Sequence, residues 1–295
     1  MFKIGCHLST SKGYLAMGKE AVSIAANTFQ YFSRNPRGGA VKPLNLEDIQ
    51  NFNAYSQEHG LHPPLAHAPY TLNPCAQKPN IREFALMVMK DDIERLEHIP
   101  GSLYNFHPGS HVQQGVSVGI ELIANTLNQV LDPNQNTLVL LETMAGKGTE
   151  LGRSFEELAY IINHVKLREK LMVCFDTCHV HDAGYDIVND FDGVMTEFDR
   201  IVGIDKIAVF HINDSKNVVG AKKDRHENIG FGEIGWQAIE YIVHHADFSH
   251  VSKILETPYV PVPETDKKNA PYTHEIAMLR SRVFDKELKK KIVEK

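Results

Sequence analysis

The sequence predicts an α/β protein, a single (β/α)8 barrel whose functional site lies at the carboxyl-terminal mouth of the strands. Eight short apolar runs rich in β-forming residues alternate with longer amphipathic stretches, and no Gly/Ser linker or charge block divides the 295 residues. Such alternation is typical of a parallel sheet with helical crossovers, and eight cycles are the number that closes a barrel. One barrel commonly occupies about 250 residues, so we expect residues 1–295 to form one domain.

The expected strands are the eight apolar runs, in chain order Lys3–Ser9, Thr28–Ser33, Leu65–Tyr70, Leu103–Pro108, Thr137–Glu142, Leu171–Thr177, Ile207–Asn213 and Lys253–Thr257. The clearest expected helices are Leu46–Gly60, Asn80–His98, Ser117–Leu131, Ser154–Val165, Phe191–Val202 and Gly235–His245. The Lys-rich end, Lys286–Lys295, is expected to form a solvated helix.

Composition narrows the class of protein and its compartment. No apolar run reaches the roughly 20 residues of a membrane span, so no membrane association is expected. The amino terminus lacks the apolar segment of a signal peptide, and the four cysteines form no paired framework, so a cytoplasmic protein is expected. The net charge of −6 argues against nucleic-acid binding that depends on overall charge alone.

Polar side chains capable of binding metal stand where the expected strands end. In a barrel these positions, and the loops after them, face one shared mouth. They are His67, His107, Glu142, Asp176, His179, His211 and Glu256, and the loop after the seventh strand adds Asp224 and His226. Any one of them alone is more often a residue that hydrogen-bonds a loop. Carboxylates gathered in one mouth would repel each other, and bound metal ions remove that conflict.

The types of these residues indicate the metal and the chemistry. Imidazole and carboxylate ligands without thiolate favour zinc, with manganese or iron as possible substitutes. Nine ligands are too many for one tetrahedral zinc but suit three ions if carboxylates bridge them. The positive charge of three Zn²⁺ would exceed the negative charge of the four carboxylates. The pocket would then be slightly positive despite the negative net charge of the chain, as binding of a phosphodiester requires. Clustered metals about 4 Å apart are typical of phosphoryl transfer, which favours a nuclease or phosphatase.

At these residues the chain resembles the endonuclease IV family of apurinic/apyrimidinic endonucleases. Two segments carry most of the resemblance, FDTCHVHDAGYD at Phe175–Asp186 and HINDSKNVVGAKKDRHENIGFGEIG at His211–Gly235. Shorter matches are IGCHLS near the start, SRNPRG after the second strand and LAHAPY after the third. The resemblance therefore spans nearly the whole chain.

The family resemblance implies three zinc sites, the first two of which share Glu142: His67, His107 and Glu142; Glu142, Asp176, His211 and Glu256; and His179, Asp224 and His226. It implies an enzyme of the deoxyribonuclease IV (phage-T4-induced) type. Such an enzyme hydrolyses the phosphodiester 5′ to an abasic site with a metal-activated hydroxide, leaving a 3′-hydroxyl and a 5′-deoxyribose phosphate, and trims blocked 3′ ends. Glu142 would also have a catalytic role, orienting or deprotonating the water.

The resemblance also implies the partner, double-stranded DNA with abasic sites or blocked 3′ ends. Arg37 and Tyr70 match the family's DNA-inserting loops, and His7 at the end of the first strand is a candidate contact behind the metal ligands. Gly38, Gly39 and Thr71 stand where some relatives have bulky residues, so lesion preference is expected to differ. A monomer is expected because DNA must reach an open barrel mouth.

Three alternatives stay open on sequence alone. A sugar isomerase or epimerase on a related barrel would use one or two divalent metals, and Asp224 and His226 would then have no metal to bind. A non-catalytic DNA-damage-binding protein would not need the complete ligand set. A general metallophosphatase would use the metals but not the inserting loops at Arg37 and Tyr70.

Overall fold

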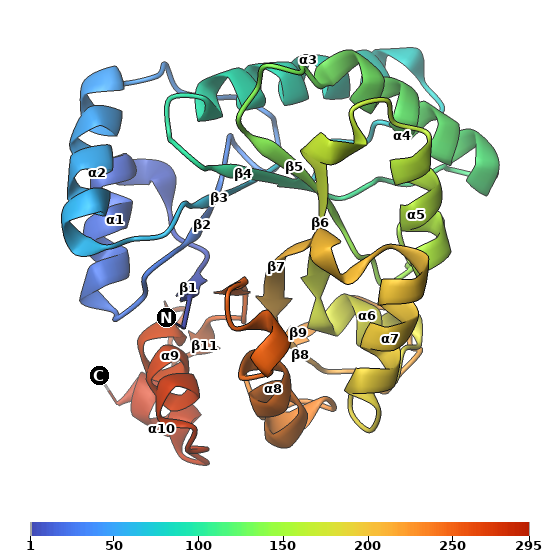
Figure 1. Cartoon of the computed structure of the whole chain (residues 1–295). Coiled ribbons are helices and arrows are strands. Elements are labelled where there is room, and N and C mark those ends of the chain that lie inside the picture. The colour runs from blue at the N-terminus through green and yellow to red at the C-terminus, as the bar shows by residue number, and fades with distance from the viewer. Residues whose placement is uncertain (1, 295) are drawn as a thin grey trace.

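The computed structural model describes residues 2–294 and confirms the predicted barrel (Figure 1). Eight parallel strands form one sheet in the order β1-β10-β7-β6-β5-β4-β3-β2. They are β1 (Ile4–Cys6), β2 (Gln30–Phe32), β3 (Leu65–His67), β4 (Leu103–Phe106), β5 (Leu138–Glu142), β6 (Leu171–Asp176), β7 (Ile207–Ile212) and β10 (Ser252–Leu255). A parallel bridge between His7 and Gln30, with the Leu8 N–H donating to the Gln30 carbonyl at 2.8 Å, joins β1 to β2.

Helices cover the outside of the strands. They are α1 (Tyr14–Ser23), α2 (Leu46–His59), α3 (Pro79–Leu96), α4 (Val116–Val130), α5 (Phe155–Asn163), α6 (Thr177–Ala183), α7 (Phe191–Ile201), α8 (Gly235–Val243), α9 (Tyr272–Ser281) and α10 (Leu288–Val293). Two short antiparallel pairs lie in the loops, β8 (Asp214–Ser215) with β9 (His226–Glu227), and β11 (Val260–Pro261) with β12 (Lys268–Asn269). Within residues 2–294 no helix is both long and apolar enough to cross a bilayer.

All six expected helices are present, and their ends follow local capping chemistry. Asn45 begins α2 by accepting the Asp48 N–H, and Gly60 ends it in the left-handed conformation at φ +63°. Ser154 caps α5 by accepting the Glu157 N–H. The sequence analysis missed α1, α6 and α9. Of the expected Lys-rich helix, α10 forms with Leu288 and Ile292 buried, so it is amphipathic and packed rather than fully solvated; Lys295 lies outside the described residues.

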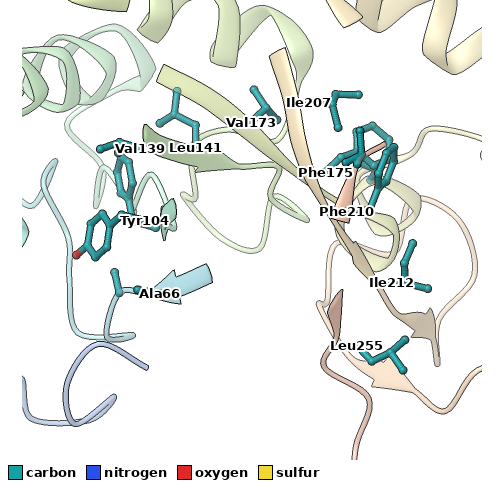
Figure 2. Packing of buried hydrophobic residues seen from close by; sticks show 14 of the residues in the cluster. Ala66, Tyr104, Val139, Leu141, Val173, Phe175, Ile207, Phe210, Ile212 and Leu255 are labelled. Atoms are coloured by element: carbon teal, nitrogen blue, oxygen red, sulfur yellow. The ribbon is translucent and has the colours of Figure 1, made fainter. Parts of the chain in front are cut away.

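Strand residues alternate between two apolar layers. One face packs against the helices, as Tyr104, Val139, Leu141, Phe175 and Phe210 do in Figure 2. The other face fills the barrel interior with a smaller layer, made of Leu65, Leu140, Cys174, Val209 and Ile254. Cys174 is therefore a buried structural residue, as expected from its place one layer below Asp176.

Candidate metal centre

The interior layer determines where the polar residues of the mouth stand. Residues two apart on a strand share a face. Each interior-layer residue is followed two positions later by a metal-competent side chain, and these side chains are His67, Glu142, Asp176, His211 and Glu256. They form a polar layer directly above the apolar one, and all but Glu256 are buried. His107, half-buried, follows β4 and joins the same layer.

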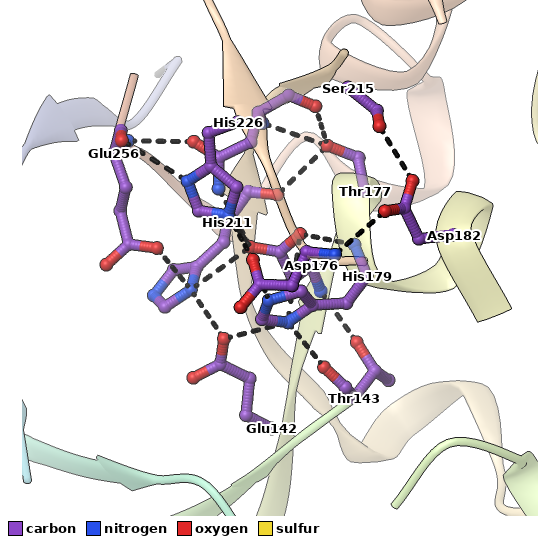
Figure 3. Close-up of polar contacts among 12 residues, drawn as sticks. Glu142, Thr143, Asp176, Thr177, His179, Asp182, His211, Ser215, His226 and Glu256 are labelled. Atoms are coloured by element: carbon purple, nitrogen blue, oxygen red, sulfur yellow. Dashed lines mark hydrogen bonds and ion pairs between the residues drawn. The ribbon is translucent and has the colours of Figure 1, made fainter. Parts of the chain in front are cut away.

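The remaining candidates reach the mouth from α6 and from the loop after β7. The Asp176 carboxylate accepts the His179 N–H at 2.8 Å and so caps α6, whose first turn turns the His179 side chain back toward Asp176 (Figure 3). His226 begins β9, which pairs with β8 and so lies beside the end of β7. Asp224 stands two residues earlier with φ +54°, an uncommon left-handed conformation for a non-glycine residue.

Glu142 lies at the centre of the predicted site residues. Its Oε2 is 3.2 Å from His67 Nε2 and 3.3 Å from His107 Nε2. Its Oε1 is 3.3 Å from His211 Nδ1, which in turn lies 3.2 Å from Glu256 Oε2 and 3.6 Å from Asp176 Oδ2. One carboxylate therefore faces two groups of ligands, one with each oxygen.

A third group gathers around Asp224. Its Oδ1 lies 3.0 Å from His179 Nε2 and 3.4 Å from His226 Nε2. Asp176 is also close, with Oδ2 3.9 Å from His226 Nε2. Cys178 Sγ lies near Asp224 and His226, but burial raises the pKa of this thiol, which keeps it protonated. All nine predicted residues thus meet in three adjoining groups.

The spacing of these atoms fits metal coordination. Ligands at about 2.0–2.1 Å from a tetrahedral zinc stand roughly 3.3 Å from one another. The separations within the three groups cluster around this value. His226 Nε2 is buried and has no hydrogen-bond partner among residues 2–294, although it points toward Asp224 and Asp176. Buried polar atoms are rarely left unpaired, so this nitrogen is suited to a cation between the acids.

Hydrogen bonds from Nδ1 to backbone carbonyls orient Nε2 of three imidazoles, those of His67, His179 and His226, toward the groups. His67 Nδ1 donates to the Ala68 carbonyl at 2.7 Å, and His179 Nδ1 donates to the Thr143 carbonyl at 2.8 Å. His226 Nδ1 donates to the Glu256 carbonyl at 3.3 Å. In each case the lone pair of Nε2 is free on the side of the carboxylates. Outer partners of this kind orient metal-binding histidines and set their tautomer.

The electrostatics of the site favour cations. Burial raises the pKa of Glu142, but His107 and His211 outweigh it and hold that pKa well below its usual value. Burial lowers the pKa of His179, but Asp176 and Asp224 hold it well above the usual value. The pKa of Asp224 falls to about 2, because His179 and His226 outweigh its burial. A field that attracts protons to imidazoles also attracts divalent ions, which compete with those protons.

Three amides that the sequence analysis missed orient the acids. Asn105 Nδ2 donates to Glu142 Oε2 at 2.5 Å, and Asn213 Nδ2 donates to Asp176 Oδ2 at 2.8 Å. Gln30 Nε2 donates to Glu256 Oε1 at 2.5 Å. Asn105 and Gln30 interrupt apolar runs, YNF and FQY, and Asn213 directly follows the apolar strand β7 in HIN, and these polar residues are the signal that could have found them.

Asp182, also missed, supports Asp224. Its Oδ1 accepts the Ser215 hydroxyl at 2.7 Å (Figure 3), and its Oδ2 accepts the Asp224 N–H at 2.9 Å and the Asn217 side-chain amide at 3.0 Å. Asp182 is fully buried on α6. These contacts hold the backbone of Asp224 in its left-handed conformation.

A cavity of about 1380 Å³ opens above the site, and its lining includes Tyr70 and Pro36, the residue before Arg37. Tyr70 lines it and is 62% exposed, and its backbone N–H donates to the Pro36 carbonyl at 3.0 Å, so its loop is joined to the one that carries exposed Arg37. His7 also lines the cavity, with Nδ1 2.9 Å from Gln30 Nε2 and 3.9 Å from Glu256 Oε1.

Gly39 has a structural reason to be small. A Cβ atom there would lie 2.4 Å from the Phe84 ring, and φ is +69°. A bulky side chain at this position would require Phe84 to move, whereas Gly38 next to it has open space.

Comparisons with known proteins agree with this geometry. Residues 19–282 match the family model of the xylose isomerase-like TIM barrels. A probable endonuclease 4 from Alkaliphilus oremlandii is 57% identical over 258 residues, covering 88% of this chain and 92% of the relative. A probable endonuclease 4 from Bacillus subtilis is 50% identical over the full length of both chains.

A solved structure agrees as well. The crystal structure of endonuclease IV from Thermus thermophilus superposes with a TM-score of 0.81 and 29% identity, covering 95% of this chain and 98% of that one. The similarity to the probable endonucleases 4 is far above what a shared barrel alone produces, and it extends over the strands that carry the site. The chain therefore belongs to the endonuclease 4 family, within the xylose isomerase-like TIM barrels.

Proposed function

We propose that this chain is a zinc-dependent DNA-repair endonuclease that hydrolyses the phosphodiester 5′ to abasic sites and trims blocked 3′ ends. The products would be a 3′-hydroxyl and a 5′-deoxyribose phosphate. The observation that carries the proposal is the position of Glu142, whose two oxygens lie 3.2–3.3 Å from four imidazoles, those of His67, His107, His179 and His211. The names of the relatives support endonuclease activity.

The proposed metal sites are the three groups described above, with Glu142 shared between the first two. Their nitrogen and oxygen donors suit Zn²⁺, with Mn²⁺ or Fe²⁺ as substitutes. When bound, divalent ions at such a site lower the pKa of water and neutralise charge on a phosphodiester. The chain itself would orient the imidazoles through backbone carbonyls, and Glu142 would orient the water and accept its proton.

The rim supplies the proposed DNA contacts. Arg37 is suited to phosphate or to the gap left by a missing base, and Tyr70 is suited to stacking on a neighbouring base. The side chains of Lys216, Lys222, Lys223 and Arg225 flank the Asp224 segment and would add contacts to phosphates. Double-stranded DNA is the proposed partner of a monomer, and the cytoplasm is its expected location.

Other functions fit the site less well. A sugar isomerase or epimerase with one or two metals leaves the group at Asp224 without a role, although His179 and His226 converge on it. A non-catalytic DNA-damage-binding protein leaves the full ligand set unexplained. A general metallophosphatase leaves the joined loops of Arg37 and Tyr70 unexplained.

Cleavage of a duplex oligonucleotide that carries one abasic analogue tests the proposal. The protein is purified, its metal content is measured, and it is assayed before and after removal and return of zinc. We expect incision immediately 5′ to the lesion, about three zincs per chain, and loss of activity on chelation. The undamaged duplex is the matched control substrate.

An enzyme that holds all its metals but leaves the damaged duplex intact would overturn the proposal. Turnover of small phosphoesters would then favour the phosphatase, and turnover of ketoses would favour the isomerase. Tight lesion binding without incision would favour the damage-binding protein.

A further inference from the structure

Gln30 is a buried amide of the site whose side chain contacts the side chains of two of the proposed ligands. Its Oε1 lies 2.6 Å from His211 Nε2, and its Nε2 lies 2.5 Å from Glu256 Oε1. The same nitrogen is 2.9 Å from His7 Nδ1. The side chain is fully buried on β2, and its backbone carbonyl accepts the Leu8 N–H where the barrel closes. Strand pairing on both sides therefore fixes the place from which the amide reaches the site.

These three contacts determine the orientation of the amide. An ionised Glu256 can only accept, so the atom facing it must be the NH₂ group, which also donates to His7 Nδ1. The opposite assignment would place two acceptors 2.5 Å apart. The carbonyl oxygen of Gln30 therefore faces His211 Nε2, which must carry the hydrogen. His211 Nδ1 is left with its lone pair toward Glu142, Asp176 and Glu256.

His211 differs in this respect from its neighbours. His67, His179 and His226 are oriented by backbone carbonyls, which no substitution removes. His211 is oriented by the side chain of a residue 181 positions away. The tautomer of this one imidazole therefore depends on the residue at position 30.

We propose that Gln30 is a positioning residue that sets the tautomer of His211 and the carboxylate orientation of Glu256 for the metal between Glu142, Asp176, His211 and Glu256. This inference rests on the proposed function. Removing an outer partner of a metal ligand typically lowers metal affinity about 10- to 100-fold. Loss of the Gln30 amide affects two ligands of one metal at once, so that site alone is weakened.

Gln30→Leu removes the polar contacts while it keeps most of the volume. Gln135→Leu is a matched control, because Gln135 is also buried and donates its amide to a backbone carbonyl, that of Thr137, at 2.6 Å, outside the site. Zinc affinity is measured by competition with a chelator, and bound zinc is counted by elemental analysis. We expect Gln30→Leu to lose tenfold or more in affinity at one site, while Gln135→Leu keeps the wild-type affinity at all sites.

The tautomer of His211 is a second measurement, and it would not change if Gln30 had a merely structural role. Nitrogen-15 long-range correlation spectra of the histidines distinguish a hydrogen on Nε2 from one on Nδ1. We expect His211 to carry it on Nε2 in the wild type and to lose this preference in Gln30→Leu. Gln30→Glu should keep an acceptor for His211 but repel Glu256, so it should keep the tautomer and still bind zinc more weakly.

Wild-type zinc affinity and an unchanged His211 tautomer in Gln30→Leu would overturn the role of Gln30. If Gln30→Leu does not fold, zinc affinity in Gln30→Glu decides the question, and wild-type affinity in that variant would overturn the role of Gln30. A wild-type protein that binds no zinc would instead overturn the proposed function, whereas wild-type zinc binding that Gln30→Leu leaves unchanged would overturn only the role of Gln30. The two failures are therefore distinguishable.

Discussion

The guanidinium of Arg34 is bound by the carboxylate of Asp92, and both side chains are buried. Arg34 Nε and Nη2 donate to Asp92 Oδ1 at 3.0 and 2.6 Å, while Arg34 Nη1 donates to the Gly39 carbonyl at 3.0 Å. The other Asp92 oxygen accepts the hydroxyls of Ser33 at 2.7 Å and Tyr104 at 3.0 Å. Asp92 on α3 thus anchors the loop that carries Arg37.

Asp92→Asn should destabilise the fold by about 3–5 kcal/mol, because it leaves the charge of Arg34 buried without its main partner. Asp91→Asn is the control, since Asp91 binds the same guanidinium at 2.6 Å but is 44% exposed and should contribute less than about 1 kcal/mol. Urea unfolding of the two variants measures the difference. Equal losses in the free energy of unfolding would mean that burial of the contact between Asp92 and Arg34 does not add to stability.

Glu142→Gln should abolish cleavage. The amide supplies one oxygen where the carboxylate faces two groups, so the shared position between them is lost. We expect the incision rate to fall by at least about 100-fold. Removing only an outer partner of a metal ligand can already cause a loss of that size. Incision rate and bound metal are measured together on the abasic duplex. Near-wild-type turnover with metal retained would refute the shared-ligand role of Glu142.

Arg37→Ala should weaken binding to abasic DNA while the metal content stays the same, since Arg37 is exposed, follows Pro36 of the cavity lining and is not one of the proposed ligands. Contacts of this kind contribute about 1–3 kcal/mol, which corresponds to roughly 5- to 140-fold in Kd. Fluorescence anisotropy with a non-cleavable lesion duplex measures it. Arg168→Ala is the control, because Arg168 is exposed just before β6, at the opposite end of the barrel. Matching affinities in the two variants would remove Arg37 from recognition.

Much of the site could be predicted from the sequence because each ligand follows an apolar strand directly. His67, Glu142 and Glu256 each end a run whose periodicity places them in the mouth, and their residue types limit the chemistry. His179 was expected in the loop after the strand Leu171–Thr177 but lies on α6, because that apolar run passes into the helix without a turn signal.

The supporting contacts could not be predicted because they join distant segments. Gln30 meets Glu256 across 226 residues, and only closure of β1 against β2 brings them together. Asp92 looks like an ordinary charge on an amphipathic helix, and its burial depends on Arg34 from another loop. Helix α1 was missed because Gly18 weakens its helical pattern, yet a Cβ there would lie 3.1 Å from the Phe52 ring, so close packing against α2 favours the glycine.

Asp182→Ala should release one metal and leave the others in place. The substitution frees the Asp224 backbone from its left-handed conformation and disturbs only the group of His179, Asp224 and His226. Elemental analysis after dialysis should find about one zinc fewer than in the wild type. Asp186→Ala serves as control, because Asp186 is exposed and its carboxylate binds Asn189 outside the three groups. Full zinc content at wild-type affinity in Asp182→Ala would show that metal binding by Asp224 does not depend on Asp182.

Glu275→Gln should change how stability depends on pH. Burial raises the pKa of Glu275 to about 7 from an ordinary 4.5, despite hydrogen bonds from Thr257 and from the backbone of Ile229. A raised carboxyl pKa gives stability that is complete below 4.5 and is lost as pH rises through about 7, when the buried acid must ionise. The glutamine carries no such charge. Relative to the wild type, the variant should therefore gain up to about 3 kcal/mol between pH 5 and pH 8. Urea unfolding at both values measures this gain, and parallel pH curves would show that Glu275 ionises equally in the folded and unfolded chain.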